Sequence, residues 1–334
     1  GCMTWSEAVA RSSDTPVEEV YRMAAAVDKD DVCNMQYTSG TTGFPKGVML
    51  THYNVVNNGK YIGDHMDLST ADRMMIQVPM FHCFGMVLSM TASMTHGTTM
   101  YPLPYFSPKP SLACVNNEHI TAFNGVPTMF IAMMQHPDFE KTDFSYMCVG
   151  IMAGSNCPAD LMKKATEVMN MKEIVSVYGQ TEASPGCTMG EVNEDIDHRV
   201  ETVGSAFPGV ECKIIDPETG EELPDGTSGE FVARGFNIMK GYYKMPEMTA
   251  EVLEEDGWFH TGDYGKLDEL GRLYITGRKK NLIILSNGKN VYPEEIEAVM
   301  SGIYGVGELV VYAGESKSDP SKEAIVLEIF PDAE

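Results

Sequence analysis

The run from Tyr37 to Gly47 constrains what this chain can fold into more than any other segment. It reads Y-T-S-G-T-T-G-F-P-K-G, so it is rich in glycine and hydroxyl residues and contains one lysine, Lys46. Glycine allows positive φ angles and close backbone approach, so successive N–H groups can converge on an anion. The hydroxyl groups add donors, and the lysine adds a mobile positive charge. Cys33, Met35 and Tyr37 alternate with polar residues, which predicts a half-buried strand leading into a polyphosphate-binding loop.

The segment is not a Walker A motif, which requires G-x4-G-K-[ST]: Pro45 precedes the lysine, and Gly47 follows it. A turn between strands can also be rich in glycine, serine and threonine without binding a ligand. The density of these residues over the whole run nevertheless favours nucleotide phosphate. The residues predicted to contact the phosphates are Thr38, Ser39, Gly40, Thr41, Thr42, Gly43 and Lys46.

Short apolar runs alternate with segments of helical character over the first half of the chain. Strands that alternate with helices predict an α/β architecture with a parallel sheet. The predicted strands are Met74–Val78, Ala122–Asn124 and Met147–Met152, and the predicted helices are Glu18–Val27, Asn54–Met66, Val126–Met134 and Ala159–Met169.

From about Val203 the pattern changes to short strands separated by turns such as D-P-E-T-G and L-P-D-G, which predicts an antiparallel β section. The predicted strands there are Val210–Ile215, Gly229–Ala233 and Gly271–Gly277. Proline at the first turn predicts a helix over Pro293–Met300.

The chain is acidic, with 48 Asp and Glu against 24 Lys and Arg and a formal charge of −24. Such a chain is a poor candidate for binding nucleic acid or anionic membranes. The 8 cysteines form no C-x-x-C pair, which predicts a reducing, cytoplasmic compartment. The most apolar stretch, Phe81–Met94, is interrupted by polar residues, so we expect no membrane span.

Several other motifs have an ordinary structural explanation when each is taken by itself. The lone histidine of P-M-F-H-C-F-G, Pro79–Gly85, could be a satisfied core residue. Gly154-Ser155-Asn156 and the segment Tyr178–Glu182 could be turns after strands. H-T-G-D at His260–Asp263 could be a turn, and the basic residues from Arg278 onward could be a solvated face.

Taken together and in this order, the motifs resemble those of the adenylate-forming enzymes, which include acyl-CoA synthetases, luciferases and peptide-synthetase adenylation domains. The resemblance runs from about Asp31 to the end of the chain. The segments G-I-M-A-G-S-N-C-P at Gly150–Pro158 and Y-G-Q-T-E-A-S-P at Tyr178–Pro185 are most similar to short-to-medium-chain fatty acyl-CoA ligases. The implied fold is α/β: residues 1–277 belong to the large adenylation domain with its parallel sheet and antiparallel section, and 278–334 to a hinge and a partial small α+β domain.

The resemblance also implies ligands, ATP, Mg²⁺ and the co-substrate CoA, and a set of residue roles. Lys46, His82, Thr181 and Glu182 form the implied catalytic group, with His82 beside the acyl group, Thr181 at the α-phosphate and Glu182 as the Mg²⁺ ligand. The other implied nucleotide contacts are Gly154, Ser155, Asn156, Tyr178 stacked on adenine, Gly179, Gln180, Asp263 at the ribose hydroxyls, and Arg278.

The implied reaction of fatty acid metabolism has two halves, in which a carboxylic acid first forms an acyl adenylate and CoA then displaces AMP. No aspartate occurs between Pro79 and Gly85, which favours an acid without an α-amino group. The family's lysine near the C-terminus, in a P-x-T-x-S-G-K-like segment, has no counterpart here. Few residues precede the phosphate loop, so we expect a fragment of a longer ligase that binds nucleotide weakly and adenylates poorly.

Two alternatives to the CoA ligase remain open on the sequence. The acyl group could be transferred to the phosphopantetheine of a carrier protein. The chain could also be a nucleotide- or acyl-binding relative without catalysis, although retention of Lys46, Glu182, Asp263 and Arg278 speaks against that. A homodimer is possible.

Overall fold

The structure is a computed structural model that describes residues 3–38, 45–155, 157–279, 281–284, 290–300, 306–316 and 319–331. The interior of the predicted phosphate loop, 39–44, lies outside the described residues, and so do Asn156 and Lys280.

A 5-stranded sheet has the strand order β4-β3-β5-β6-β7, and all of its strands are parallel. Its strands are β3 (Arg73–Ile76), β4 (Thr99–Pro102), β5 (Ala122–Phe123), β6 (Val149–Ile151) and β7 (Glu173–Val175). The segments between them include η2 (Phe84–Thr91), α4 (Ala92–His96), α5 (Pro108–Glu118), α6 (Pro127–Met134), η3 (Phe139–Lys141) and α7 (Ala159–Val168). The predicted α/β architecture with a parallel sheet is confirmed.

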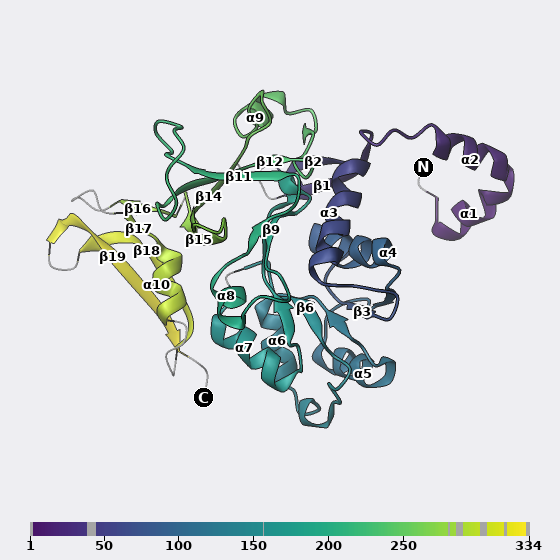
Figure 1. Cartoon of the computed structure of the whole chain (residues 1–334), viewed down its shortest axis with the longest axis horizontal. Helices are drawn as coiled ribbons and strands as arrows, with labels where there is room; N and C mark the ends of the chain where they lie inside the picture. The colour runs from purple at the N-terminus through teal and green to yellow at the C-terminus, as the bar shows by residue number, and fades with distance from the viewer. Residues whose placement is uncertain are drawn as a thin grey trace.

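Both faces of this sheet are buried because helices cover each of them (Figure 1). Met74 and Ile76 of β3 pack with η2, α4 and α3 (His52–His65) on one face. Met75, between them, packs with α5, α6 and α7 on the other face. Alternate side chains of a strand point to opposite faces, so a sheet covered on both sides requires a continuous apolar run. That requirement explains why M-M-I could be recognised as a strand.

The predicted antiparallel section is also confirmed. It consists of β11 (Val210–Ile215), β12 (Gly229–Gly235), β14 (Phe259–Leu267) and β15 (Leu273–Arg278), paired in that order. A smaller antiparallel sheet joins β8 (Val177–Gly179), β9 (Gly186–Met189) and β10 (Ser205–Ala206), with η4 (Thr181–Ala183) between β8 and β9 and α8 (Ile196–Glu201) after β9.

The predicted phosphate loop lies in a β-hairpin, which the sequence did not predict in full. The expected strand is β1 (Val32–Thr38), but a second strand, β2 (Lys46–Thr51), follows and pairs with it so that Thr38 lies opposite Lys46. The apolar run of β2 is too short to be recognised as a strand without its partners. β13 (Gly241–Tyr242), from much later in the chain, pairs with the other edge of β2. Thr51 ends the strand and caps α3 through its hydroxyl group.

The two ends of the chain extend away from the centre of the molecule (Figure 1). The first elements are α1 (Trp5–Ala10), η1 (Arg11–Asp14) and α2 (Val17–Ala25), and α9 (Pro246–Ala250) follows β13. The last are β16 (Ile283–Ile284), β17 (Asn290–Val291), α10 (Pro293–Met300), β18 (Val306–Ser316) and β19 (Asp319–Pro331). β15 continues through residue 277 to Arg278, the first residue of the predicted second domain, so no break in the chain marks the predicted boundary. The boundary after residue 277 stays a prediction.

Among the described residues, no helix is both long enough and apolar enough to cross a bilayer.

Gly204 connects the smaller antiparallel sheet to the larger one. Its carbonyl accepts a hydrogen bond from the N–H of Leu273 at 2.9 Å, and the neighbouring Val203 N–H donates to the carbonyl of Leu273 at 2.9 Å. The φ angle of Gly204 is +72°, and a Cβ atom there would lie 1.9 Å from the carbonyl carbon of Met189. A side chain at this position would therefore overlap with the backbone at the end of β9 and disturb the junction of the two sheets.

We predict that Gly204→Ala destabilises the fold by roughly 1–3 kcal/mol more than Gly226→Ala, because it adds steric overlap to the same backbone strain. Gly226 is a matched control, since its φ is +80° and nothing lies within 4 Å of the added Cβ. Urea-induced unfolding, followed by circular dichroism, measures the difference. Equal destabilisation by the two substitutions would contradict the assigned role of Gly204.

A buried carboxylate joins β12, β14 and the residue after β15. Glu230 is 3% exposed, and its carboxylate lies 3.5 Å from Nδ1 of His260 and 3.0 Å from Nζ of Lys279. His260 also contacts Glu254, with 2.6 Å between Nε2 and Oε1. Glu230 and Glu254 together raise the pKa of His260 above its ordinary value, against the opposing effect of partial burial. The imidazolium form of His260 therefore stabilises this junction.

We predict that the stabilisation by His260 depends on pH. A pKa that is higher in the folded than in the unfolded protein gives stability that is complete below the unfolded value, about 6.5, and is lost as the pH rises through the folded value. His260→Gln should therefore lower the free energy of unfolding more at pH 6 than at pH 9. Glu254→Gln should reduce that difference by removing one partner. An equal effect of His260→Gln at the two pH values would refute the prediction.

Candidate active site

Three of the predicted nucleotide-binding residues meet at one end of the antiparallel section. Tyr178 comes from β8, whereas Asp263 in β14 lies directly opposite Arg278 in β15. The hydroxyl group of Tyr178 donates a hydrogen bond to Oδ2 of Asp263 at 2.6 Å. Nε of Arg278 lies 3.4 Å from Oδ1 of the same carboxylate. An aromatic ring, a carboxylate and a guanidinium from distant parts of the sequence thus form one cluster.

Burial and the charge of Asp263 raise the pKa of Tyr178 well above its ordinary value, so this phenol stays protonated as a donor. The ring is 9% exposed and meets Phe231 edge to face, with 5.2 Å between the ring centroids. The amide of Gln180 donates to the carbonyl of Thr261 at 3.1 Å and lies 3.4 Å from the Tyr178 hydroxyl. The tyrosine is therefore held firmly in place from two sides.

The cluster lines a cavity of about 440 Å³ between the parallel and the antiparallel sheet. This volume lies within the range of small-molecule sites. The cavity brings together the predicted residues Gly154, Ser155, Tyr178, Gly179, Asp263 and Arg278. Its other walls are Cys157, Ser176, Val177, Val200, Glu201, Thr202, Val203, Ile275, Thr276, Gly277 and Glu294.

A second cluster contains the predicted phosphate lysine and the predicted metal ligand. Nζ of Lys46 lies 4.6 Å from the centre of the Tyr242 ring. The hydroxyl group of Tyr242 donates to Oε1 of Glu182 at 2.9 Å. Glu182 is 9% exposed, and in the described part of the chain no lysine or arginine forms an ion pair with it.

The described residues contain no group of three or more His, Cys, Asp or Glu that could hold a metal ion. One carboxylate is nonetheless compatible with Mg²⁺, which commonly takes one or two carboxylates together with phosphate oxygens and water. Glu182 thus stays the predicted Mg²⁺ ligand.

Cys83 lies between two further predicted residues. Its sulfur is 3.8 Å from Oγ1 of Thr181 and 3.8 Å from Nδ1 of His82. Burial raises the pKa of Cys83 to about 11, so the group is a thiol at neutral pH. Partial desolvation lowers the pKa of His82, and its Nδ1 accepts a hydrogen bond from the N–H of Phe84 at 3.1 Å. The imidazole is accordingly neutral at pH 7.

The predicted site residues do not all line one cavity. The described residues Thr38, Lys46, His82, Gln180, Thr181 and Glu182 are absent from the walls of the 440 Å³ cavity. The amide group of Gln180 contacts the hydroxyl group of Tyr178, and Thr181 and Glu182 follow Gln180 directly in the chain. Ser39, Gly40, Thr41, Thr42, Gly43 and Asn156 lie outside the described residues, so their roles stay predictions.

Tyr242 is the residue that sequence analysis missed. It stands 60 positions after Glu182 in the chain and follows no recognisable motif of charged or hydroxyl residues. Only the pairing of β13 with β2 brings its ring to Lys46. Nothing in the local sequence distinguishes it from the neighbouring Tyr243.

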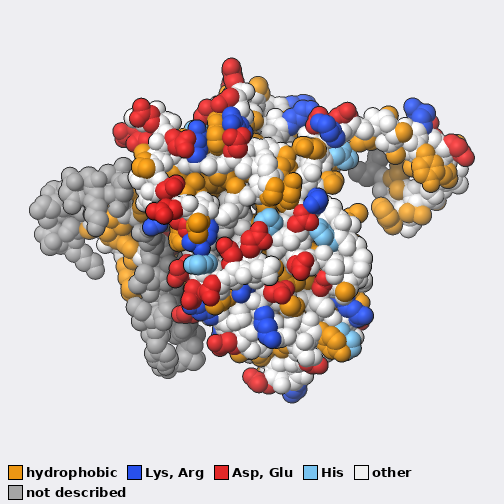
Figure 2. All heavy atoms as spheres, viewed as in Figure 1, with side chains coloured by type: hydrophobic (Ala, Val, Ile, Leu, Met, Phe, Trp, Pro, Cys, Tyr) orange, Lys and Arg blue, Asp and Glu red, His pale blue; other side chains and the backbone are white. Residues whose placement is uncertain are grey.

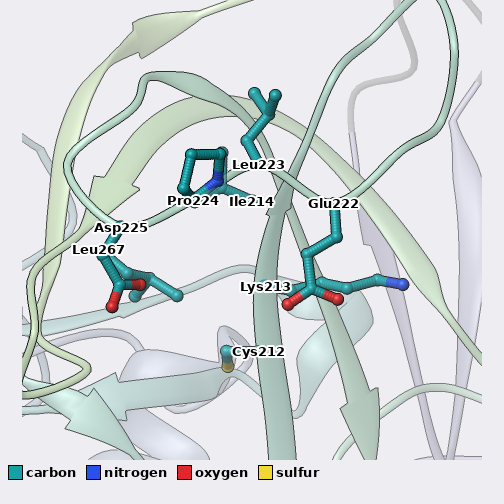
Figure 3. Close-up of a pocket in the computed structure, with 8 residues that line it drawn as sticks. All are labelled: Cys212, Lys213, Ile214, Glu222, Leu223, Pro224, Asp225 and Leu267. Carbon is teal, nitrogen blue, oxygen red and sulfur yellow. The ribbon is translucent and has the colours of Figure 1, made fainter.

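Another cavity, of about 140 Å³, lies away from these residues (Figure 3). It is lined by β11, the turn after it and Leu267 of β14, and none of the predicted site residues is among its walls. On the face drawn in Figure 2, acidic side chains are spread over many elements, with basic side chains between them. We place the candidate site at the larger cavity because predicted site residues line it, whereas none of them lines the smaller one.

Known proteins are similar to this chain in both sequence and fold. The family model described as AMP-binding enzyme matches residues 3–243. A Bacillus subtilis (strain 168) protein provisionally named acyl-CoA synthetase YngI is 48% identical over 297 residues, covering 89% of this chain and 54% of that protein. The rat protein named medium-chain acyl-CoA ligase ACSF2, mitochondrial, is 40% identical over 272 residues, covering 80% of this chain and 44% of that protein.

Solved structures of other proteins share the fold of this chain. ATP-bound MatB from Rhodopseudomonas palustris is 34% identical with a TM-score of 0.81, covering 91% of this chain and 59% of that one. MenE, the o-succinylbenzoate CoA synthetase of Bacillus subtilis, in complex with ATP and a magnesium ion, is 27% identical with a TM-score of 0.79, covering 91% and 61%. The chain spans about half the length of the curated relatives it matches. The matched family model and the shared fold together show that this chain belongs to the family of AMP-binding, adenylate-forming enzymes.

Proposed function

We propose that this chain is the nucleotide-binding part of an AMP-forming acyl-CoA synthetase that activates a short- or medium-chain fatty acid. The observation that carries the proposal is the cluster of Tyr178, Asp263 and Arg278 on the wall of a ligand-sized cavity. The names of the relatives, which are acyl-CoA synthetases and ligases, support the reaction class. The division into a large domain and a small domain after residue 277 is part of the proposal.

In this proposal the adenosine part of ATP occupies the 440 Å³ cavity. Asp263 accepts hydrogen bonds from the ribose hydroxyls, and Arg278 donates to the nucleotide. The β- and γ-phosphates lie toward Lys46, whose ammonium group stands at the first residue of β2. Thr181 contacts the α-phosphate, which lies between the ribose and the β-phosphate. Mg²⁺, held by Glu182, would neutralise phosphate charge.

The proposed reaction needs no protein nucleophile. An oxygen of the substrate carboxylate attacks the α-phosphorus of ATP, the bond to the bridging oxygen breaks, and pyrophosphate leaves. The sulfur of CoA then attacks the acyl carbon, the bond to the AMP oxygen breaks, and the thiol proton is released. Catalysis of both steps depends on positioning and on stabilisation of charge. These requirements match a site made of hydroxyl groups, cations and a carboxylate.

The surroundings of Gly154 support an acid with an apolar chain. Gly154 has a φ of +88°, and a Cβ atom there would lie 3.0 Å from Val126 and 3.7 Å from Phe84. A side chain at residue 154 would therefore be crowded by these two apolar residues. The neighbours of Gly154 are apolar, and no carboxylate lies between Pro79 and Gly85 to pair with an α-amino group. The name of the rat relative, a medium-chain acyl-CoA ligase, supports medium chain length.

Cytoplasmic location, a homodimer and the choice of CoA over a carrier protein also belong to the proposal. One solved neighbour, 25% identical with a TM-score of 0.78, is the A-PCP of McyG complexed with phenylalanyl-adenylate, so a carrier-protein acceptor is tested beside CoA.

We predict that Asp263→Asn weakens binding of ATP about tenfold but changes binding of 2′,3′-dideoxy-ATP less than about twofold. A hydrogen bond from a hydroxyl to a charged acceptor contributes about 1.5–3 kcal/mol, and dideoxy-ATP cannot form it. Asparagine still accepts the bond from Tyr178, so that contact within the cluster is retained. Isothermal titration calorimetry measures both ligands.

The exposed Asp225, on the wall of the 140 Å³ cavity, provides the matched control Asp225→Asn. This variant should bind both nucleotides like the unaltered chain. Equal weakening of ATP and dideoxy-ATP by Asp263→Asn would contradict the proposed ribose contact.

The proposed function is tested with a panel of acids from acetate to palmitate, together with benzoate and L-alanine, in the presence of MgATP. We expect octanoate to stimulate pyrophosphate release and L-alanine to have no effect, with a low absolute rate. Lys46→Gln should lower the stimulated rate at least about tenfold because a charged phosphate contact is lost. Lys244→Gln, which removes an exposed lysine near Tyr243, should not.

Stimulation by alanine, or release that does not depend on any acid, would overturn the proposal. Adding either CoA or a phosphopantetheinylated carrier protein and measuring the thioester formed separates the two acceptors. The CoA thioester is expected, and exclusive loading of the carrier protein would replace the CoA ligase with a carrier-protein ligase.

A further inference from the structure

We propose that Tyr242 is a positioning residue that orients the carboxylate of Glu182 and the ammonium group of Lys46 toward the same ligand, and thereby sets how much Mg²⁺ the site needs to bind ATP. The inference rests on the proposed function, in which Glu182 holds the metal and Lys46 contacts the phosphates. It adds a residue and a measurable property that the motifs do not contain.

Tyr242 contacts the two groups through different parts of its side chain. The hydroxyl group donates to Oε1 of Glu182 at 2.9 Å, and the ring lies 4.6 Å from Nζ of Lys46. The side chain is 5% exposed, so neither contact competes strongly with bulk water. A cation over an aromatic ring is attracted to the negative face of the ring, and more strongly when the pair is desolvated.

The backbone explains why these three side chains converge. Tyr242 in β13 pairs with Val48 in β2. Paired residues of antiparallel strands share a face, and residues two apart in a strand share it as well, so Lys46 lies on the face of Tyr242. The segment before β13 also holds Glu182, because the N–H of Met239 donates to the carbonyl of Glu182 at 2.8 Å. One short segment therefore contacts both functional groups.

The tyrosine is anchored independently of the site. Its N–H donates to Oγ1 of Thr249 at 2.9 Å, and the N–H of Tyr243 donates to the carbonyl of Gly47 at 2.7 Å. Burial, together with the charge of Glu182 and the hydrogen bond to it, raises the pKa of Tyr242, so its hydroxyl group is a donor at neutral pH.

A phenol that donates to a carboxylate becomes richer in electrons, because hydrogen bonds in a chain polarise one another. Its ring then attracts a cation more strongly, which links the position of Lys46 to that of Glu182. The hydrogen bond also occupies one oxygen of Glu182 and directs the other. Groups that orient a metal ligand in this way typically change metal affinity about 10–100-fold when they are removed.

The next residue offers a matched control. Tyr243 also has a lysine over its ring, with 5.1 Å from Nζ of Lys244 to the centroid, but it is 43% exposed. Within the described ranges, no hydrogen bond joins its hydroxyl group to a carboxylate. Tyr243→Phe therefore removes a tyrosine hydroxyl from the same segment without affecting the proposed contacts.

The test measures equilibrium binding of ATP to the chain over a range of Mg²⁺ concentrations and again in excess EDTA. Tyr242→Phe keeps the ring and removes the hydroxyl group. We expect it to raise the Mg²⁺ concentration for half-maximal binding about tenfold and to change the metal-free affinity for ATP less than about twofold. Tyr242→Leu removes the ring too and should also weaken metal-free binding. Tyr243→Phe should match the unaltered chain in both measurements.

A second variant tests the coupling of Tyr242 with Glu182 directly, and circular dichroism checks that each variant is folded. Glu182→Asp retains the carboxylate but withdraws it from the Tyr242 hydroxyl, so it should also raise the Mg²⁺ requirement. Adding Tyr242→Phe to Glu182→Asp should then have little further effect, since coupled residues are not additive. Fully additive effects would overturn the inference.

The outcomes separate this inference from the proposed function. If Glu182→Gln raises the Mg²⁺ requirement and Tyr242→Phe does not, the inference is wrong and the proposed metal ligand stands. If Glu182→Gln has no effect on the Mg²⁺ requirement, the proposed metal ligand is wrong and the inference falls with it.

Discussion

The pairing of β14 with β15 is the constraint on which the candidate site depends. It places Asp263 opposite Arg278, and the hydroxyl of Tyr178 then joins Asp263 at 2.6 Å. Since Tyr178 lies in β8, this hydrogen bond connects the smaller antiparallel sheet to the larger one at the wall of the cavity. An uncompensated carboxylate would be costly at this position, so the tyrosine and the arginine stabilise the wall as well as shaping it.

A second connection begins only a few residues farther along the chain. Glu182 is joined to Tyr242 and, through its ring, to Lys46 at the start of β2. The segment from Tyr178 to Glu182 therefore contacts the antiparallel section at one end and the β1–β2 hairpin at the other. A ligand that reaches from the cavity to Lys46 would lie along this segment. A nucleotide with its adenosine in the cavity and its phosphates at Lys46 would have this orientation.

Much of the fold was predictable, and the exceptions share one cause. β11 and α10 begin and end at the predicted residues, and β3, β5 and β6 lie inside the predicted runs or begin one residue earlier, because buried apolar runs and proline positions are local signals. The other two parallel strands, β4 and β7, were not predicted. β2 was missed because a three-residue apolar run acquires strand character only from its partners. Tyr242 was missed for the same reason: its role comes from a strand pair that joins segments far apart in the chain.

The sequence by itself determined the family, the change from alternating strands and helices to an antiparallel section, and the residue types available for nucleotide binding. Those features are encoded locally, in glycine and hydroxyl density, apolar periodicity and motif order. Only the tertiary structure decided which of these residues meet. The Tyr178–Asp263–Arg278 cluster and the contacts of Tyr242 with Glu182 and Lys46 depend on strand pairing and on distances across the fold, and neither leaves a periodic signal in the chain.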